Sequence, residues 1–251
     1  MPYAANELFD LSGKVALVTG GSRGLGLEMV RAFARAGADV VITSRKAEAC
    51  EAAASEVRAM GRRALAYGAH VGQWDALPGL VDAAYDAFGK VDILVNNAGM
   101  SPLAPSAVET GEALFDKVID VNFKGPFRLT ALVGARMFEG DGGAILNISS
   151  TGAIRPQPRF IPYAGAKAAL NALTIGFALE YKPKVRVNAI MAGPFLTDIA
   201  KAWPAEARER AHNILGRPGQ PNEIVTAALY LVSPASSFTT GSVIEVSGGT
   251  L

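Results

Sequence analysis

Short apolar runs alternate with longer amphipathic stretches along almost the whole chain. The spacing predicts strands near residues 15–19, 39–43, 64–69, 92–96, 144–149, 185–190 and 243–246. It predicts helices at 24–37, 46–60, 75–88, 110–138, 162–181 and 221–233. Strands that alternate with helices form a parallel sheet, because each crossover connection places a helix on a face of the sheet. We therefore expect an α/β fold: a Rossmann-type, doubly wound parallel sheet of about seven strands with helices on both faces.

Residues 191–220 interrupt this regular pattern, because they are rich in proline, glycine, alanine and charged residues. A long connection of this kind between a strand and a helix is typical of a loop that contacts ligands, and we expect it to form a mobile substrate lid. No repeat, linker or low-complexity stretch divides the sequence, and 251 residues suit one domain. The sequence therefore predicts a single domain over residues 1–251.

A glycine-rich turn follows the first predicted strand, at the junction with the first predicted helix. Glycines let the backbone approach a pyrophosphate closely, and the free N–H groups at a helix N-terminus favour its negative charge. A glycine turn at this junction is a strong indication of a dinucleotide site. The residues that we expect to bind there are Gly20, Ser22, Arg23, Gly24, Leu25 and Gly26.

A tyrosine and a lysine lie four positions apart at the start of a predicted helix. Positions i and i+4 share one helix face, so the phenol of Tyr163 is expected beside the ammonium group of Lys167. A nearby positive charge lowers the pKa of a phenol from about 10 towards the range of a working acid/base catalyst. Ser150, at the end of the fifth predicted strand, precedes this pair. For the tyrosine and lysine alone, two solvated helix residues are the alternative interpretation.

Residues of these types recur where predicted strands end. In doubly wound sheets the ligand binds beyond the carboxyl ends of the strands, where the strand order reverses. The glycine turn, Arg45, residues 96–99, residues 149–150 and residues 193–197 all follow predicted strands. We therefore expect them to converge on one crevice.

Taken in order, these motifs resemble those of the short-chain dehydrogenase/reductase family, in the compact single-domain branch that includes the 3-oxoacyl reductases. The resemblance extends from about Leu11 to Gly249. It rests on residues 19–26 and 96–99 and on Asn122, Ser150, Tyr163 and Lys167. It implies a single dinucleotide-binding oxidoreductase domain that transfers hydride between a nicotinamide and a carbonyl or secondary alcohol.

The resemblance also implies a role for each of four catalytic residues. Ser150 would hold the substrate oxygen, Tyr163 would be the general acid/base, and Lys167 would lower its pKa and bind the nicotinamide ribose. Asn122 would anchor a water molecule that links the lysine to solvent; a polar helix residue bonded to its own backbone is the alternative. Further cofactor contacts are expected from Ser44, Arg45, His70, Val71, Asn97, Ala98, Gly99, Tyr163, Lys167, Gly193 and Thr197.

The end of the second predicted strand indicates which dinucleotide binds. An acidic residue there, roughly 20 residues past the glycine turn, bonds the adenosine ribose of NAD and repels the extra phosphate of NADP. This chain has Ser44 followed by Arg45, and Arg23 lies in the glycine turn. Two guanidinium groups could clamp a 2′-phosphate, so we expect NADP (NADPH), with NAD less favoured. A solvated helix start is the alternative role for Arg45.

The substrate is defined only as a small molecule with a carbonyl or alcohol group. Three places depart from the family pattern: residues 69–71 read Ala-His-Val where an aspartate is often found, Ala192 replaces a proline, and Ser247 replaces an aspartate. None of them removes a catalytic group. Arg155 and Arg159 could meet an anionic substrate, and Arg128, Lys182 and Lys184 could dock a phosphopantetheine carrier, with ordinary solvated surface as the alternative. The expected pocket walls are Met100, Ser101, Pro102, Gly152, Ile154, Arg155, Phe160, Phe195 and Trp203.

Composition excludes several other classes of function. Lysine and arginine number 24 against 23 acidic residues, and no basic tract indicates a nucleic acid partner. Cys50 is the single cysteine, with His70 and His212 as the two histidines, so neither a disulfide nor a metal site is expected. The sequence shows no signal-peptide pattern and no apolar run of ~20 residues, so we expect a soluble, cytoplasmic enzyme with no membrane partner.

Two further expectations concern the molecule as a whole. A catalytically silent NADPH-binding sensor or scaffold of the same fold is the alternative function, although intact Ser150, Tyr163 and Lys167 argue against it. Small residues between Ala164 and Ala178 let another helix approach closely, which predicts a homo-oligomer and most simply a tetramer with D₂ symmetry.

Overall fold

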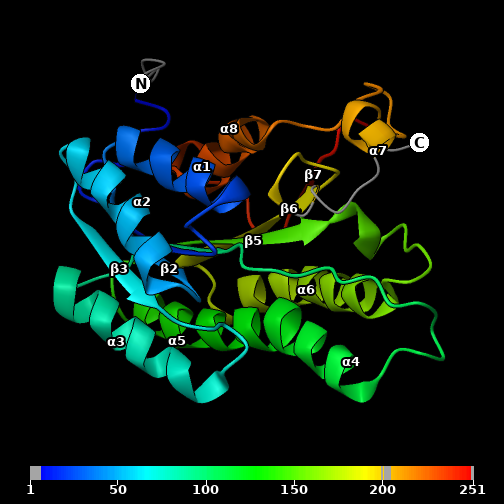
Figure 1. Cartoon of the computed structure of the whole chain (residues 1–251). Helices are drawn as coiled ribbons and strands as arrows, with labels where there is room; N and C mark the ends of the chain where they lie inside the picture. Colours follow the sequence, from blue (N-terminus) through cyan, green and yellow to red (C-terminus); the bar gives the residue numbers. More distant parts are fainter. Residues whose placement is uncertain (1–6, 199, 201–204, 250–251) are drawn as a thin grey trace.

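The computed structural model describes residues 7–198, 200 and 205–249. In these residues the chain forms a parallel sheet of seven strands in the order β3-β2-β1-β4-β5-β6-β7 (Figure 1). The order reverses between β1 and β4, which confirms the predicted doubly wound sheet. The strands are β1 Val15–Thr19, β2 Asp39–Ser44, β3 Ala64–Gly68, β4 Ile93–Asn96, β5 Gly143–Ser150, β6 Val185–Ala192 and β7 Val243–Val246.

Helices cover both faces of this sheet (Figure 1). One face carries α1 Gly24–Arg35, α2 Ala47–Ala59 and α8 Val225–Val232. The other carries α3 Leu77–Phe88, α5 Gly125–Glu139 and α6 Ile161–Glu180, with α4 Glu112–Ile119 packed beside α6. Short 3₁₀ turns occupy Trp74–Ala76, Thr151–Ala153, Pro221–Ile224 and Pro234–Ser236. Across the described residues, no helix has both the length and the apolar character that a bilayer crossing requires.

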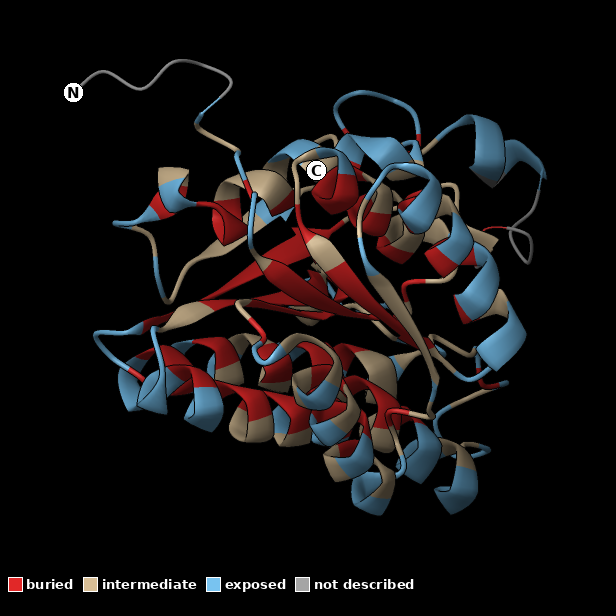
Figure 2. Ribbon diagram, turned by 90° about the vertical axis from the view of Figure 1, so that its left-hand side faces the viewer, coloured by how far each residue is buried: buried red, intermediate tan, exposed pale blue. Residues whose placement is uncertain are grey.

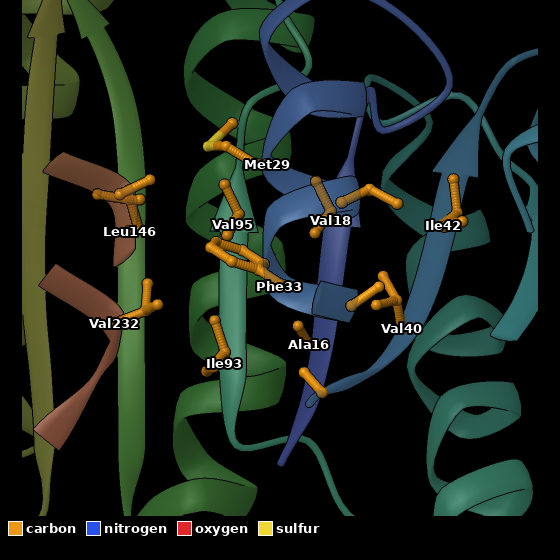
Figure 3. Packing of buried hydrophobic residues seen from close by; sticks show 14 of the residues in the cluster. Ala16, Val18, Met29, Phe33, Val40, Ile42, Ile93, Val95, Leu146 and Val232 are labelled. Atoms are coloured by element: carbon orange, nitrogen blue, oxygen red, sulfur yellow. The ribbon is translucent and has the colours of Figure 1, made fainter. Parts of the chain in front are cut away.

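The central strands β1, β2 and β4 are largely apolar because both of their faces are buried (Figure 2), whereas β3 and β7 at the edges of the sheet are only partly buried. Alternate residues of β1 point to opposite helix layers: Val18 packs in the cluster that includes α1, and Leu17 packs in the cluster beneath α3 and α5. Figure 3 shows Met29 and Phe33 of α1 lying over Val18 and Val95 at the centre of the sheet. Parallel pairing with β2 on one side and β4 on the other fixes the register of β1, so the turn that follows it is held in place.

The long helix predicted over 110–138 is interrupted. The segment Asp120–Lys124 forms a turn of π-helix between α4 and α5. Pro126 has no N–H group, so the α-helical hydrogen bond from position 126 to the carbonyl of Asn122 cannot form. A Cβ on Gly125 would also lie 2.4 Å from the carbonyl oxygen of Val71, so the helix start and the loop after β3 meet backbone to backbone. A second difference is α7 Ala205–Glu209, a short helix within the segment 191–220 in which we expected none.

Candidate active site

The loops after β1 and β4 are tied together where the strand order reverses. The hydroxyl of Thr19 donates to the carbonyl of Val95 at 3.2 Å and accepts from the backbone N–H groups of Asn97 and Ala98, both at 3.0 Å. The amide Nδ2 of Asn97 donates to the carbonyls of Thr19 at 2.9 Å and Gly20 at 3.2 Å. These bonds hold the start of the loop after β4 against the glycine turn.

The glycine turn fits the pyrophosphate of a dinucleotide. Gly20 and Gly24 have φ angles of 64° and 56°, which side-chain-bearing residues rarely adopt. A Cβ on Gly26 would lie 2.2 Å from the carbonyl oxygen of Gly20, so only glycine allows α1 to start this close to the turn. No side chain caps the start of α1, and its first turn holds no acidic residue. Its first N–H groups are therefore available to an anion, as the sequence predicts.

The glycine turn after β1 contacts the end of β2 through side chains. The hydroxyl of Ser22 donates to the Oγ atom of Ser44 at 3.0 Å, and this oxygen also lies 3.1 Å from the Sγ atom of Cys50. Arg45, the next residue, is exposed. The structure therefore brings the glycine turn and Arg45 to the same edge, where the adenosine half of a dinucleotide is expected.

Arg23 forms a contact that the sequence interpretation did not include. Its Nη1 atom lies 3.1 Å from Oδ2 of Asp198, in the segment that follows β6. The neighbouring Thr197 lies 3.4 Å from the position that a Cβ of Gly24 would occupy. Two consecutive residues of this segment thus rest on the glycine turn, and one of them, Thr197, is among the expected cofactor contacts.

Ser150 and Tyr163 meet at the carboxyl end of β5. The hydroxyl of Ser150 hydrogen-bonds to the phenol of Tyr163 and also accepts the N–H of Gly152 at 3.1 Å. Ser149, the neighbouring candidate, is buried and donates to the carbonyl of Lys167 at 3.3 Å. The ring of Phe160 packs edge-on against Tyr163, with 6.0 Å between the ring centroids. The geometry therefore pairs Ser150 rather than Ser149 with the tyrosine.

Lys167 is buried beneath this pair. The residue is 3% exposed, and Nζ donates to the carbonyl of Ile148 at 2.8 Å and lies 5.8 Å from the ring centroid of Tyr163. Burial lowers the pKa of Lys167 from 10.5 to about 8, because an ammonium group loses its hydration there.

The pKa of Tyr163 moves in the direction opposite to our expectation. We expected the ammonium group of Lys167 to lower this pKa. Burial of the phenol instead raises it, and the hydrogen bond with Ser150 opposes that rise. The reason is desolvation, which disfavours a phenolate in the same apolar surroundings that disfavour the charged form of Lys167.

Asn122 lies in the π turn, with its side-chain amide fully engaged. Nδ2 donates to the carbonyls of Met100 and Val118, both at 2.9 Å, and Oδ1 accepts the N–H of Met100 at 3.3 Å. A Cβ on Gly99 would lie 3.0 Å from Oδ1 of Asn122 and 3.7 Å from Nζ of Lys167. Gly99 therefore lies where Asn122 and Lys167 approach each other.

The remaining expected cofactor residues lie at the ends of β3 and β6. Nδ1 of His70 accepts the N–H of Gly72 at 3.1 Å, and Val71 is buried in the core beneath α3 and α5. The N–H of Gly193 donates to the carbonyl of Val246 at 2.9 Å, and a Cβ on Gly193 would lie 2.6 Å from Cα of Ser247. Gly193 is thus held at the end of the β6–β7 pair.

One of the expected pocket walls lies elsewhere. Phe195 is buried in the core cluster with α1 and α8 and pairs with Gly219 through a parallel bridge, so it is not a free wall. Ile154 and Arg155 are exposed. The expected wall Trp203 lies outside the described residues.

Arg159 connects two loops in a way that its sequence position did not indicate. Its φ angle is 73°, its carbonyl accepts the N–H of Ala104 at 2.8 Å, and its Nε donates to the carbonyl of Ala104 at 3.0 Å. The loop after β4 is thereby tied to the loop after β5, directly before Phe160. A local sequence pattern does not predict such a contact, because its two residues lie 55 positions apart.

Comparison with known proteins covers all of these elements. Residues 14–208 match the family model for short chain dehydrogenase. The chain is 40% identical to an uncharacterised oxidoreductase of Mycobacterium tuberculosis, over 97% of this chain and 94% of that protein. It is 37% identical to the 7α-hydroxysteroid dehydrogenase of Escherichia coli, over 95% of this chain and 94% of that protein. A solved 7α-hydroxysteroid dehydrogenase complexed with NADH and 7-oxo glycochenodeoxycholic acid has a TM-score of 0.94 at 36% identity, and the match covers 100% of this chain and 98% of that one.

Proposed function

The chain belongs to the short-chain dehydrogenase/reductase family, and from this premise we propose that it is an NADP(H)-dependent oxidoreductase in which Tyr163 is the general acid/base. Members of this family are oxidoreductases that use a nicotinamide cofactor. The observation that carries the proposal is the placement of Ser150, Tyr163 and Lys167 at the same sheet edge as the glycine turn. Its substrate is a small carbonyl compound or secondary alcohol.

The catalytic residues act on the substrate oxygen. When bound, the nicotinamide supplies hydride to the carbonyl carbon or accepts it from the alcohol carbon. In the reductive direction, Ser150 donates a hydrogen bond to the oxygen on which negative charge develops, and Tyr163 delivers the proton. The raised pKa of the phenol keeps this proton in place at neutral pH until the alkoxide forms.

Lys167 and Asn122 support the tyrosine. Lys167 would hold the nicotinamide ribose, and its ammonium group, 5.8 Å from the ring centroid of Tyr163, would favour the phenolate. The side-chain amide of Asn122 is committed to Met100 and Val118, so the water molecule is anchored by its backbone carbonyl. Pro126 leaves that carbonyl without the α-helical partner that would compete with water.

The choice of NADP(H) rests on this chain's own residues, since the solved relative carries NADH. Ser44 places no carboxylate at the end of β2 to repel a 2′-phosphate, and its hydroxyl is held by Ser22. Arg45 is exposed beside it, and Arg23 lies across the turn. A phosphate held by one guanidinium group gains a charge-assisted hydrogen bond of about 1.5–3 kcal/mol.

We also propose that residues 191–220 form the substrate lid of a single domain. Thr197 and Asp198 rest on the glycine turn, and the N–H of Leu196 donates to the carbonyl of Gly219 at 2.8 Å. The two ends of the segment are thereby joined next to the site. A cytoplasmic location is proposed from the single cysteine, which is buried and free.

A homotetramer is proposed from the outward face of α6. Gly165 and Gly176 have open space around them. Ile161, Ile175 and Leu179 are at least half exposed, at 53%, 50% and 62%. The exposed face of α6 carries no charged residue between Ile161 and Leu179, and such a face is suited to burial against a symmetry-related copy.

The test of the function is Tyr163→Phe, which deletes the proton donor and keeps the ring. We expect turnover of carbonyl or alcohol substrates, followed by NADPH absorbance, to fall by about 10² to 10⁴, with cofactor binding retained. Tyr85→Phe on α3 is the matched control and should keep wild-type activity. Retention of more than about a tenth of the activity in Tyr163→Phe would contradict the role of the tyrosine as acid/base.

A further inference from the structure

Asp198 lies beside Arg23, a residue of the proposed cofactor site, and carries the opposite charge. Its Oδ2 atom is 3.1 Å from Nη1 of Arg23, although the two residues are 175 positions apart in the chain. Thr197 packs over Gly24 at the same place, so the contact belongs to a docked segment rather than to an isolated side chain. The segment is anchored three residues earlier by the Phe195–Gly219 bridge.

Arg23 also lies beside the expected position of the 2′-phosphate. Ser22, its neighbour, is bonded to Ser44 at the end of β2, where an adenosine ribose would sit. Asp198 already occupies one edge of the Arg23 guanidinium group through Nη1, and a carboxylate and a phosphate held by the same guanidinium group repel each other. The carboxylate of Asp198 therefore reduces the contribution of Arg23 to the affinity for a 2′-phosphate.

We propose that Asp198 is a specificity-determining residue: it competes with the 2′-phosphate of NADP(H) for Arg23, and so weakens the preference for NADP(H) over NAD(H). This inference builds on the proposed cofactor site. NADH has no 2′-phosphate, so its binding leaves the pair between Arg23 and Asp198 intact. The 2′-phosphate of NADPH opposes this pair, which couples the choice of cofactor to the segment after β6.

The expected effect is moderate because both side chains are accessible to solvent, at 66% for Arg23 and 37% for Asp198. Exposed ion pairs of this kind change an equilibrium by about 1.4-fold to fivefold. Asp198→Asn removes the competing charge and keeps the size of the side chain. We expect it to raise the ratio of NADPH to NADH affinity by about two- to fivefold at low salt, and less at high salt.

A double-mutant cycle measured by fluorescence titration of both cofactors tests the competition. The proteins are the wild type, Asp198→Asn, Arg23→Ala and the double variant, with Glu206→Gln as a control for loss of one negative charge elsewhere in the segment. The affinity ratio should rise in Asp198→Asn, and it should change neither when Asp198→Asn is added to Arg23→Ala nor in Glu206→Gln.

Three results would overturn the inference: an unchanged ratio in Asp198→Asn, an equal rise without Arg23, or an equal rise in Glu206→Gln. The last two would assign the effect to long-range charge instead of competition for one guanidinium group. A wild type that binds NADH as tightly as NADPH would contradict the proposed cofactor preference. The competition is judged separately, from the change in the ratio on Asp198→Asn.

Discussion

Replacing the buried Lys167 with methionine should stabilise the free protein while it removes activity. A fall in the pKa of Lys167 from 10.5 to about 8 means that holding its charge in the fold costs about 3 kcal/mol at neutral pH. Methionine has a similar length and no charge. It loses the hydrogen bond to the carbonyl of Ile148, which contributes about 1 kcal/mol. The net gain is about 2 kcal/mol, or about 4–8 °C in Tm for a protein of this size.

The pH dependence separates this charge effect from changes in packing. The folded-state pKa of Lys167 is depressed, so below about pH 8 both the folded and the unfolded chain carry the charge and the full cost is present. Between about 8 and 10.5 the folded chain has lost the proton and the unfolded chain has not, so stability of the wild type rises with pH. The advantage of Lys167→Met should therefore shrink by about 2 kcal/mol between about pH 7 and about pH 9.5.

Urea unfolding of the wild type and Lys167→Met at these two pH values measures the difference. Groups common to both proteins cancel, so the change with pH reports on Lys167 alone. Lys117→Met, at an exposed position of α4, is the matched control and should alter stability by less than about 0.5 kcal/mol at either pH. An advantage of Lys167→Met that is equal at both pH values would refute the reasoning, because the lysine would then carry no burial cost.

Two further predictions concern the cofactor and the assembly. NADPH should bind at least about tenfold more tightly than NADH. Arg45→Ala should remove most of this preference, and Ser44→Asp should favour NADH because the new carboxylate repels the 2′-phosphate. Titration of both cofactors checks all three expectations, and equal affinities in the wild type would refute them. Light scattering should show a tetramer at micromolar concentration, and Ala172→Glu on the outward face of α6 should reduce its size, whereas Ala52→Glu on α2 should not. A monomeric wild type would contradict the assembly.

The periodicity of the sequence predicted nearly every regular element, because it reflects local burial. The seven predicted strands are all present, with ends within about two residues, and burial on both faces makes the central ones short apolar runs. The sequence also predicted the glycine turn and the shared helix face of Tyr163 and Lys167, because both features depend on residues close together in the chain. Periodicity did not reveal the π turn at Asp120–Lys124, since the sequence on either side of this turn keeps a helical pattern.

The tertiary structure decided the properties that depend on distant residues. Desolvation raised the pKa of Tyr163, and it comes from everything packed around the phenol, which no spacing along the chain encodes. The pairing of Arg23 with Asp198, and of Arg159 with Ala104, joins segments that only the folded sheet edge brings together. By itself, the sequence determined which chemical groups reach the carboxyl edge of the sheet. Packing around that edge determined the direction in which the pKa values of Tyr163 and Lys167 shift, because desolvation comes from all the groups packed around a side chain. The folding of distant segments against one another determined which neighbour each side chain contacts.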